Sequence, residues 1–149
     1  MSPGAPVPTV AFVDLPRVVL AEDHAGVAEQ LRNLLATEFD VVATVADGLA
    51  LVRAVNALQP DVVIADIVMP GLDGIAATAA ILASRPTTRV VLATVHNDPE
   101  LAERGYAAGA LACVSKHRAG RELLPAVRAA LRGERYVGSG IGSDVGGVT

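Results

Sequence analysis

The chain has 149 residues, 52% of them hydrophobic and 19% charged, with one cysteine and a formal net charge of −4 at pH 7. This length and composition predict one globular domain with a sizeable core, and the acidic balance argues against a broad nucleic-acid or membrane-surface footprint. The single Cys113 excludes an internal disulfide framework, and no apolar run approaches the roughly 18 residues of a spanning helix, so we expect a cytoplasmic protein with no membrane partner.

Strands and helices are predicted to alternate along most of the chain, after a Pro-rich lead over residues 1–16 that we expect to be flexible. The strands are short apolar runs bounded by turn residues, whereas the helices show apolar residues three or four positions apart. The expected strands are Arg17–Ala21, Asp40–Ala46, Asp61–Asp66, Arg89–Thr94 and Leu111–Ser115, and the expected helices are Ala25–Glu38, Leu51–Leu58, Gly74–Arg85, Asp98–Ala108 and Gly120–Leu131.

Five strand–helix units in succession predict an α/β fold, a doubly wound five-stranded parallel sheet with helices on both faces and right-handed crossovers. A sheet order of 2-1-3-4-5, as in flavodoxin-like folds, places the topological switch point between the first and third strands. This domain is expected to span residues 17–132. Residues 133–149 are rich in glycine and are expected to form a flexible tail or linker.

Polar residues lie at the carboxyl ends of four expected strands, where doubly wound folds keep their chemistry. The expected sheet order brings the acidic residues after the first and third strands around one crevice, although they are far apart in the sequence. The residues are Glu22 and Asp23 after the first strand, Asp66 after the third, Thr94 after the fourth and Lys116 after the fifth.

Three carboxylates in one crevice repel one another, which raises their pKa values unless a cation joins them. Mg²⁺ suits such oxygen ligands, and it keeps several of its waters. With Mg²⁺ and Lys116 the charges sum to about zero, so an incoming phosphoryl group meets no net repulsion. Asp66 is then placed to attack phosphorus and form an acyl phosphate, with Lys116 and the Thr94 hydroxyl as donors to the phosphoryl oxygens.

Four short motifs occur in order, each at a predicted strand end: Leu20-Ala-Glu-Asp23, Asp66-x-x-Met-Pro-x-x-x-Gly74, Val90-Val-Leu-Ala-Thr94 and Gly109-Ala-x-x-x-Val-x-Lys116. Each motif alone is a weak signal, and the four together are a strong one. On these motifs the chain, over about residues 17–132, resembles the receiver domain of two-component response regulators. Its closing segment, which contains Glu122-Leu-Leu-Pro-Ala-Val-Arg128 and Arg132-Gly-Glu-Arg-Tyr-Val137, is most similar to the LuxR/NarL-type subclass.

The resemblance implies a role for the acidic residues. Asp66 is the expected phosphoacceptor, which receives its phosphoryl group from a histidine kinase. Mg²⁺ is expected to be held by Asp23, Asp66 and the backbone carbonyl of Val68, with Glu22 as the other member of the acidic pair. Self-catalysed phosphotransfer and autodephosphorylation are the only expected reactions, so we do not expect an enzyme.

The resemblance also implies a switch, in which Thr94 supplies the hydroxyl and Lys116 senses the phosphoryl group. Three positions depart from the family pattern: Val95 stands where a small residue is usual, Cys113 where an aromatic switch residue is usual, and His117 where proline is common. The expected partners are a histidine kinase and a second copy of the chain, docked through the face of the fourth helix, fifth strand and fifth helix. DNA is expected only where a helix-turn-helix domain follows residue 149.

Two other functions compete with this interpretation. Val95 and Cys113 also fit a phosphorylation-independent pseudo-receiver, an interaction module that keeps the fold without the switch. A hydrolase with an aspartyl nucleophile is disfavoured, because such enzymes carry a second Asp two residues after the nucleophile, where this chain has Val68. His24 lacks ligand spacing and is expected to be exposed, and Tyr106 is expected on the outer face of the fourth helix.

Overall fold

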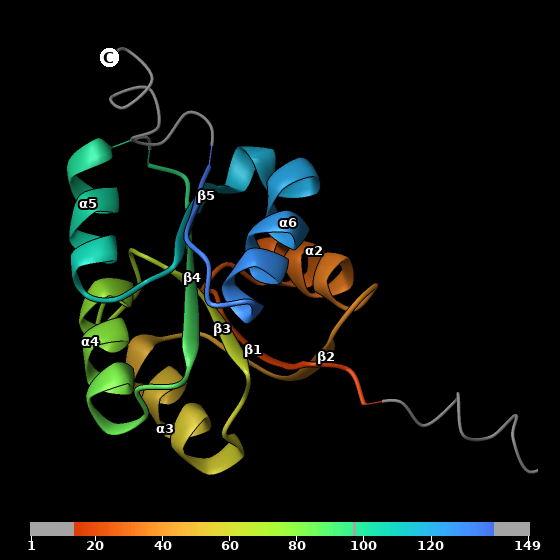
Figure 1. Ribbon diagram of the computed structural model, residues 1–149, viewed down its shortest axis with the longest axis horizontal. Helices are drawn as coiled ribbons and strands as arrows, with labels where there is room; N and C mark the ends of the chain where they lie inside the picture. Colours follow the sequence, from red (N-terminus) through yellow and green to blue (C-terminus); the bar gives the residue numbers. More distant parts are fainter. Residues whose placement is uncertain (1–13, 97, 139–149) are drawn as a thin grey trace, which may run out of the picture.

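The computed structural model describes residues 14–96 and 98–138, so the expectations for residues 1–13 and 139–149 lie outside the described residues. Strands and helices alternate in the predicted order (Figure 1). No helix in the described ranges is long and apolar enough to span a membrane. The strands are β1 (Arg17–Ala21), β2 (Asp40–Val45), β3 (Val62–Asp66), β4 (Arg89–Thr94), β5 (Ala112–Ser115) and β6 (Tyr136–Val137); the helices are α2 (Ala25–Leu35), α3 (Gly48–Leu58), α4 (Gly74–Ser84), α5 (Pro99–Ala107) and α6 (Ala119–Leu131), preceded by the 3-10 turn η1 (Lys116–Arg118).

The strands form one parallel sheet in the order β2-β1-β3-β4-β5-β6. The predicted doubly wound order 2-1-3-4-5 is therefore confirmed, with β6 added at one edge. Helices α2 and α6 cover one face of the sheet, and α3, α4 and α5 cover the other (Figure 1). The topological switch point lies between β1 and β3, as predicted.

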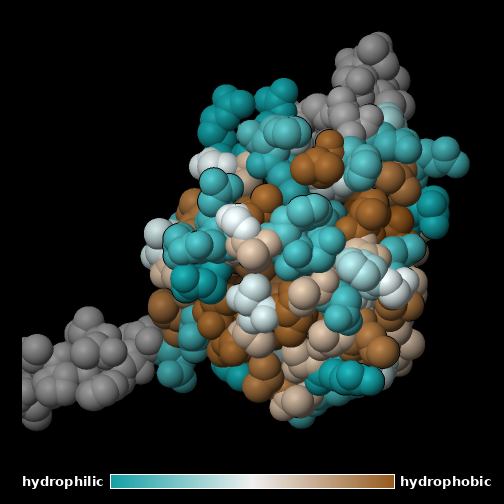
Figure 2. Space-filling model, turned by 180° about the vertical axis from the view of Figure 1, so that it is seen from behind, coloured by the Kyte–Doolittle hydropathy of each residue, from teal (hydrophilic) through white to brown (hydrophobic). Residues whose placement is uncertain are grey.

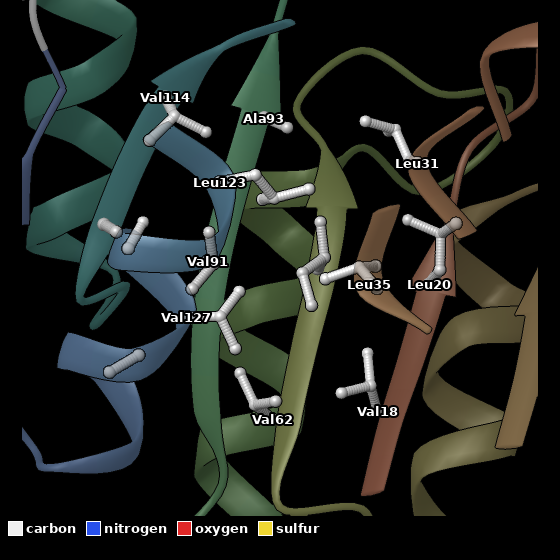
Figure 3. Close-up of a cluster of buried hydrophobic side chains, with 14 of the residues drawn as sticks. Val18, Leu20, Leu31, Leu35, Val62, Val91, Ala93, Val114, Leu123 and Val127 are labelled. Atoms are coloured by element: carbon white, nitrogen blue, oxygen red, sulfur yellow. The ribbon is translucent and has the colours of Figure 1, made fainter. Parts of the chain in front are cut away.

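Strand β3 shows why the sheet is buried on both faces. All five of its residues are buried, and successive side chains point to opposite sides of the sheet. Val62 and Ile64 join the cluster that contains Leu123 of α6, as Figure 3 shows for Val62 and Leu123. Val63 and Ala65 join the cluster beneath α3 and α4. The uninterrupted apolar run of β3 therefore reflects burial under two helical layers.

Short-range contacts in the loop after β3 determine where α4 begins. The Asp73 carboxylate accepts a hydrogen bond from the Ala76 amide at 2.8 Å, which caps the first turn of α4. The Gly74 amide donates to the Ile67 carbonyl at 2.7 Å. A Cβ atom added to Gly74 would overlap the Asp66 carbonyl oxygen, so this close approach of α4 to β3 requires glycine.

Strand β6 is the main difference from the prediction. It lies within residues 133–149, which we expected to be a flexible tail or linker, and it extends the expected five-stranded sheet to six strands. Tyr136 pairs with Ala112 and Val137 pairs with Cys113 of β5. Two residues between glycine-containing turns are too few for a periodic signal, so the strand forms because the edge of β5 offers free backbone groups.

Large apolar side chains are exposed at a few separate positions of the surface. Figure 2 shows hydrophobic residues interspersed with hydrophilic ones over the rear face of the molecule. Two of the exposed residues follow the carboxyl ends of β3 and β4, next to the site described below. In the described ranges the exposed large hydrophobic residues are Leu15, Leu49, Val68, Val95 and Val137.

We expect Gly74→Ala to lower the free energy of unfolding by about 2 kcal/mol or more, because the added methyl group overlaps the backbone of β3. Gly120→Ala is the matched control: Gly120 is the second residue of α6, and no atom lies within 4 Å of an added Cβ. The free energy of unfolding of this control variant is expected to rise by about 0.5–1 kcal/mol. Urea denaturation followed by circular dichroism measures both, and equal effects would contradict the close packing at Gly74.

Candidate functional site

Three of the predicted site residues are buried together at the carboxyl edge of the sheet. Glu22 follows β1, Asp66 ends β3 and Lys116 follows β5. Their side chains are 1%, 5% and 7% exposed, respectively. Because parallel strands end at the same edge, the fold brings these three groups together from distant parts of the chain.

The Lys116 ammonium group joins the two buried carboxylates. Its Nζ atom lies 2.7 Å from Asp66 Oδ2 and also contacts Glu22 Oε1. A buried charge is costly unless it is paired, and each of these charges has an opposite partner. Two carboxylates and one ammonium leave a net charge of −1, so the group still attracts a further cation.

Burial and hydrogen bonding act in opposite directions on the pKa values of this pair. Burial raises the pKa of Glu22, but hydrogen bonds with Lys116 and His24 lower it more, so the pKa lies below its ordinary value. Burial lowers the pKa of Lys116, but its hydrogen bonds to Asp66 and Glu22 raise it more, so the pKa lies above its ordinary value. Glu22 and Lys116 are therefore both charged at neutral pH.

Both oxygens of the Asp66 carboxylate are held by donors. Oδ2 accepts a hydrogen bond from Lys116 Nζ at 2.7 Å, and Oδ1 accepts one from the Val68 backbone amide at 3.2 Å. Val68 contacts the carboxylate through its backbone amide, whereas its side chain is half exposed. The expected role of the Val68 carbonyl as a metal ligand stays a prediction.

An acidic cluster surrounds the Asp66 carboxylate. Glu22, Asp23, His24 and Asp66 each offer one ligand atom, and these atoms all lie within 4.8 Å of one another. The structure therefore brings together the three carboxylates that the sequence analysis singled out. Carboxylate oxygens are the protein ligands that Mg²⁺ prefers, so this set of donors fits the predicted ion.

His24 is the residue of this cluster that the sequence analysis missed. Its side chain is 71% exposed, as expected, but Nδ1 lies 3.1 Å from Glu22 Oε2 and 3.2 Å from Asp23 Oδ1. The His24 backbone amide also donates to Glu22 Oε2 at 3.0 Å. The signal that could have found it is its place directly after the acidic pair, at the residue that precedes α2.

Thr94 lies at the carboxyl end of β4, the strand next to β3. Its side chain is buried, and Oγ1 accepts a hydrogen bond from the His96 backbone amide at 3.0 Å. The hydroxyl is thus engaged by the loop that follows β4. A pocket of about 320 Å³ opens beside this loop and reaches the Asp66 carboxylate. Its lining residues are Asp23, His24, Val27, Asp66, Val68, Val95, His96 and Lys116.

The positions that depart from the family pattern lie at different depths. Val95 is half exposed on the wall of the pocket. Cys113 is buried in β5, in the cluster beneath α3, α4 and α5, and burial raises the pKa of its thiol to about 11. The thiol is therefore protonated at neutral pH, and Cys113 serves as a small core residue.

Known proteins share the sequence and the fold of this chain. Residues 18–128 match the response regulator receiver domain. Oxygen regulatory protein NreC of Staphylococcus carnosus (strain TM300) is 35% identical over 124 residues, 81% of this chain and 57% of NreC. A two-component response regulator of the LuxR family from Aurantimonas sp. SI85-9A1 has a TM-score of 0.85 at 31% identity, over 91% of this chain and 98% of that chain. The isolated receiver domain of RcsB from Salmonella enterica serovar Typhimurium, in the presence of the phosphomimetic BeF3−, has a TM-score of 0.78 at 26% identity, over 86% of this chain and 96% of that chain.

The chain therefore belongs to the family of response regulator receiver domains, which are signalling domains of two-component systems. Within that family its relatives are regulators of the LuxR/NarL type, the subclass that the closing segment predicted. The chain spans 57% of the length of the curated relatives it matches.

The Cys113 thiol is expected to resist modification in the native protein. A pKa of about 11 lowers the thiolate fraction at pH 8 by about a hundredfold relative to a free thiol, and burial blocks access as well. Reaction with Ellman's reagent is therefore expected to be slow in native buffer and rapid in denaturant, with one thiol titrated per chain. Rapid reaction of the native protein at pH 8 would show that β5 is more open than the structure indicates.

Acid is expected to lower the folding stability of the metal-free protein by protonating Glu22. The pKa of this carboxylate is lower in the folded than in the unfolded chain, so its stabilising effect is full above the unfolded value of about 4.3 and is lost as pH falls through the folded value. Glu22→Gln should be less stable than the wild type at pH 7, and the difference should narrow in acid. Urea denaturation in EDTA measures this, with the exposed Glu29→Gln as control; a gap that stays constant with pH contradicts the Glu22–Lys116 pairing.

Proposed function

We propose that the chain is a phosphorylation-dependent receiver that accepts a phosphoryl group from the phosphohistidine of a histidine kinase on Asp66. The observation that carries this proposal is the state of the Asp66 carboxylate: it is buried, held by Lys116 and the Val68 amide, and reached by a pocket of about 320 Å³. A buried carboxylate fixed at both oxygens beside an open pocket suits nucleophilic attack more than core packing.

The proposed reaction is a transfer between two nucleophiles. The P–N bond of the phosphohistidine breaks, and a P–O bond to an Asp66 carboxylate oxygen forms. The electron pair of the broken bond leaves with the imidazole, which takes up a proton from water. Lys116, already 2.7 Å from Asp66, is placed to donate to the transferred phosphoryl oxygens, so the charge that arrives is met by a cation that is already in position.

Mg²⁺ is the cofactor that the donor set supports. Glu22, Asp23, Asp66 and the carbonyl of Val68 would hold it, and it would supply positive charge beside the phosphoryl oxygens. The cluster needs that charge, because Lys116 compensates only one of the two buried carboxylates it contacts. His24 lies against the same acidic pair and restrains the Glu22 carboxylate from the solvent side.

The proposed switch acts through Thr94. Its hydroxyl now accepts a hydrogen bond from the His96 amide, and in the proposed switch it turns to donate to a phosphoryl oxygen. That turn releases the His96 amide and so disturbs the loop that leads into α5. A differential stabilisation of a few kcal/mol is enough to shift such a two-state element.

The pocket favours the phosphorylation-dependent receiver over the phosphorylation-independent pseudo-receiver. Val95, which stands where a small residue is usual, is one of the two positions that fit the pseudo-receiver. Its side chain is half exposed and forms part of the pocket wall, so the route to Asp66 stays open. The hydrolase stays disfavoured. Val68 stands at the position where a second Asp would act, and it contacts Asp66 only through its backbone amide.

The proposed partners are a histidine kinase and a second copy of the chain, in the cytoplasm. RcsB, which this chain resembles at 26% identity, binds DNA as dimers in one of the matched structures. We propose that this protein also pairs with a second copy, through the face built by α5, β5 and α6, and that it binds DNA only where a helix-turn-helix domain follows residue 149. The curated relatives extend beyond the matched residues, which make up 57% of their length.

Asp66→Asn is expected to abolish phosphorylation by acetyl phosphate, because an amide oxygen is a poor nucleophile toward phosphorus. Asp73→Asn is the matched control: it changes an exposed Asp of the same loop to a residue that can still cap α4. Intact-mass spectrometry should show one added phosphoryl group on the wild type and on Asp73→Asn, and its loss when EDTA removes Mg²⁺.

Two outcomes would reject the proposal. Equal labelling of Asp66→Asn and wild type would place the modification on another residue. A wild type that is folded, binds Mg²⁺ and remains unlabelled would favour the phosphorylation-independent interaction module.

A further inference from the structure

Tyr106 connects α5 to strand β6, beside the first residues of β5. It was expected on the outer face of its helix, but its ring is half buried against the core cluster that contains Cys113. Its hydroxyl donates a hydrogen bond to the Tyr136 backbone carbonyl at 2.9 Å. The two residues are thirty positions apart, so this contact joins a helix to a strand that the chain reaches only after α6 (Figure 1).

A second contact involves the same ring. The Arg135 guanidinium carbon lies 4.0 Å from the centroid of the Tyr106 ring, within the range of a cation–π interaction. Tyr106 therefore holds the residue before β6 with its ring face and the first residue of β6 with its hydroxyl. Burial raises the pKa of Tyr106 above its ordinary value, so the hydroxyl keeps the proton it donates.

The end of the segment is held by close packing. Gly138 is buried, and a Cβ added there would lie 2.9 Å from the Cys113 carbonyl oxygen and 3.2 Å from Val114 Cα. Contacts this close to backbone require glycine. Between these two ends, the Tyr136 amide donates to the Leu111 carbonyl at 2.8 Å.

We propose that Tyr106 is a latch that couples α5 to residues 135–138, so that displacement of either one loosens the other. The side chain at position 113 is a buried thiol within the core cluster, and Tyr106 of the neighbouring helix supplies the hydroxyl that reaches β6. Helix α5 begins five residues after Thr94, on the loop that the Thr94 hydroxyl holds. The latch therefore links the carboxyl end of β4 to the sheet edge formed by β6.

Tyr106→Phe tests the latch, because it removes the hydroxyl and keeps the ring. Hydrogen–deuterium exchange of the 149-residue protein, followed by NMR, should show the Tyr136 amide exchanging about three- to tenfold faster. The Val63 amide in central β3 should be unchanged, which separates a local latch from a general loss of stability. Unchanged exchange at Tyr136 overturns the proposal.

Gly138→Ala tests the coupling from the other end. It should displace residues 135–138 and raise exchange within α5, because coupling between two elements is reciprocal. Gly120→Ala, where an added Cβ meets no atom within 4 Å, is the matched control and should leave α5 unchanged. Displacement of residues 135–138 without any effect on α5 would show that the two elements are independent, and the latch would be rejected.

The latch also predicts a response to beryllofluoride with Mg²⁺, and this arm rests on the proposed function. Binding should raise Tyr136 amide exchange in the wild type and raise it less in Tyr106→Phe, where the hydroxyl is already missing. Tyrosine fluorescence gives a second measurement of the same response, because the chain has no tryptophan and its two tyrosines are Tyr106 and Tyr136. A wild type that binds beryllofluoride with no change at Tyr136 contradicts the latch. A wild type that does not bind it contradicts the proposed function, and the two variants above then still decide the latch.

Discussion

The ion pairs of Lys116 with Glu22 and Asp66 are the interaction on which the rest of the site depends. Three charged side chains are buried at one edge of the sheet, and each would be costly there without the others. The lysine contacts the end of β1 and the end of β3 from the turn that opens α6, so one ammonium group ties three elements together. Loss of the lysine would leave two buried carboxylates without their cation, and Asp66 would lose the partner that orients its Oδ2 atom and compensates its charge.

The backbone around this centre holds the Asp66 carboxylate in place. Gly74 lets α4 start against β3, and the cap at Asp73 closes the turn that carries the Val68 amide to Asp66 Oδ1. These contacts are local, and the glycine and the aspartate before an Ala-rich helix indicate them in the sequence. The resulting loop borders a pocket that Asp66 also lines, and the proposed phosphotransfer needs such an opening beside the carboxylate.

Much of the fold and of the site could be predicted because the signals are local or periodic. Strand β3 is apolar throughout since two helical layers bury it, and the parallel order follows from the alternation of strands and helices. The carboxylates, the hydroxyl and the lysine could be placed at strand ends for the same reason. Strand β6 and the contacts of Tyr106 could not, because a two-residue strand has no period and its pairing depends on the edge of β5.

By itself, the sequence determined the alternation of strands and helices and the set of polar residues at the strand ends, since hydrophobic periodicity and turn residues decide these within short windows. The sheet order 2-1-3-4-5 was expected by analogy with flavodoxin-like folds. Only the tertiary structure decided which charges pair. Lys116 contacts Glu22 and Asp66, which lie 94 and 50 positions earlier in the chain, and His24 turns back onto the acidic pair. Such contacts depend on the distances between strand ends in the folded chain and on which buried charges still lack an opposite partner. Neither can be predicted from a single stretch of residues.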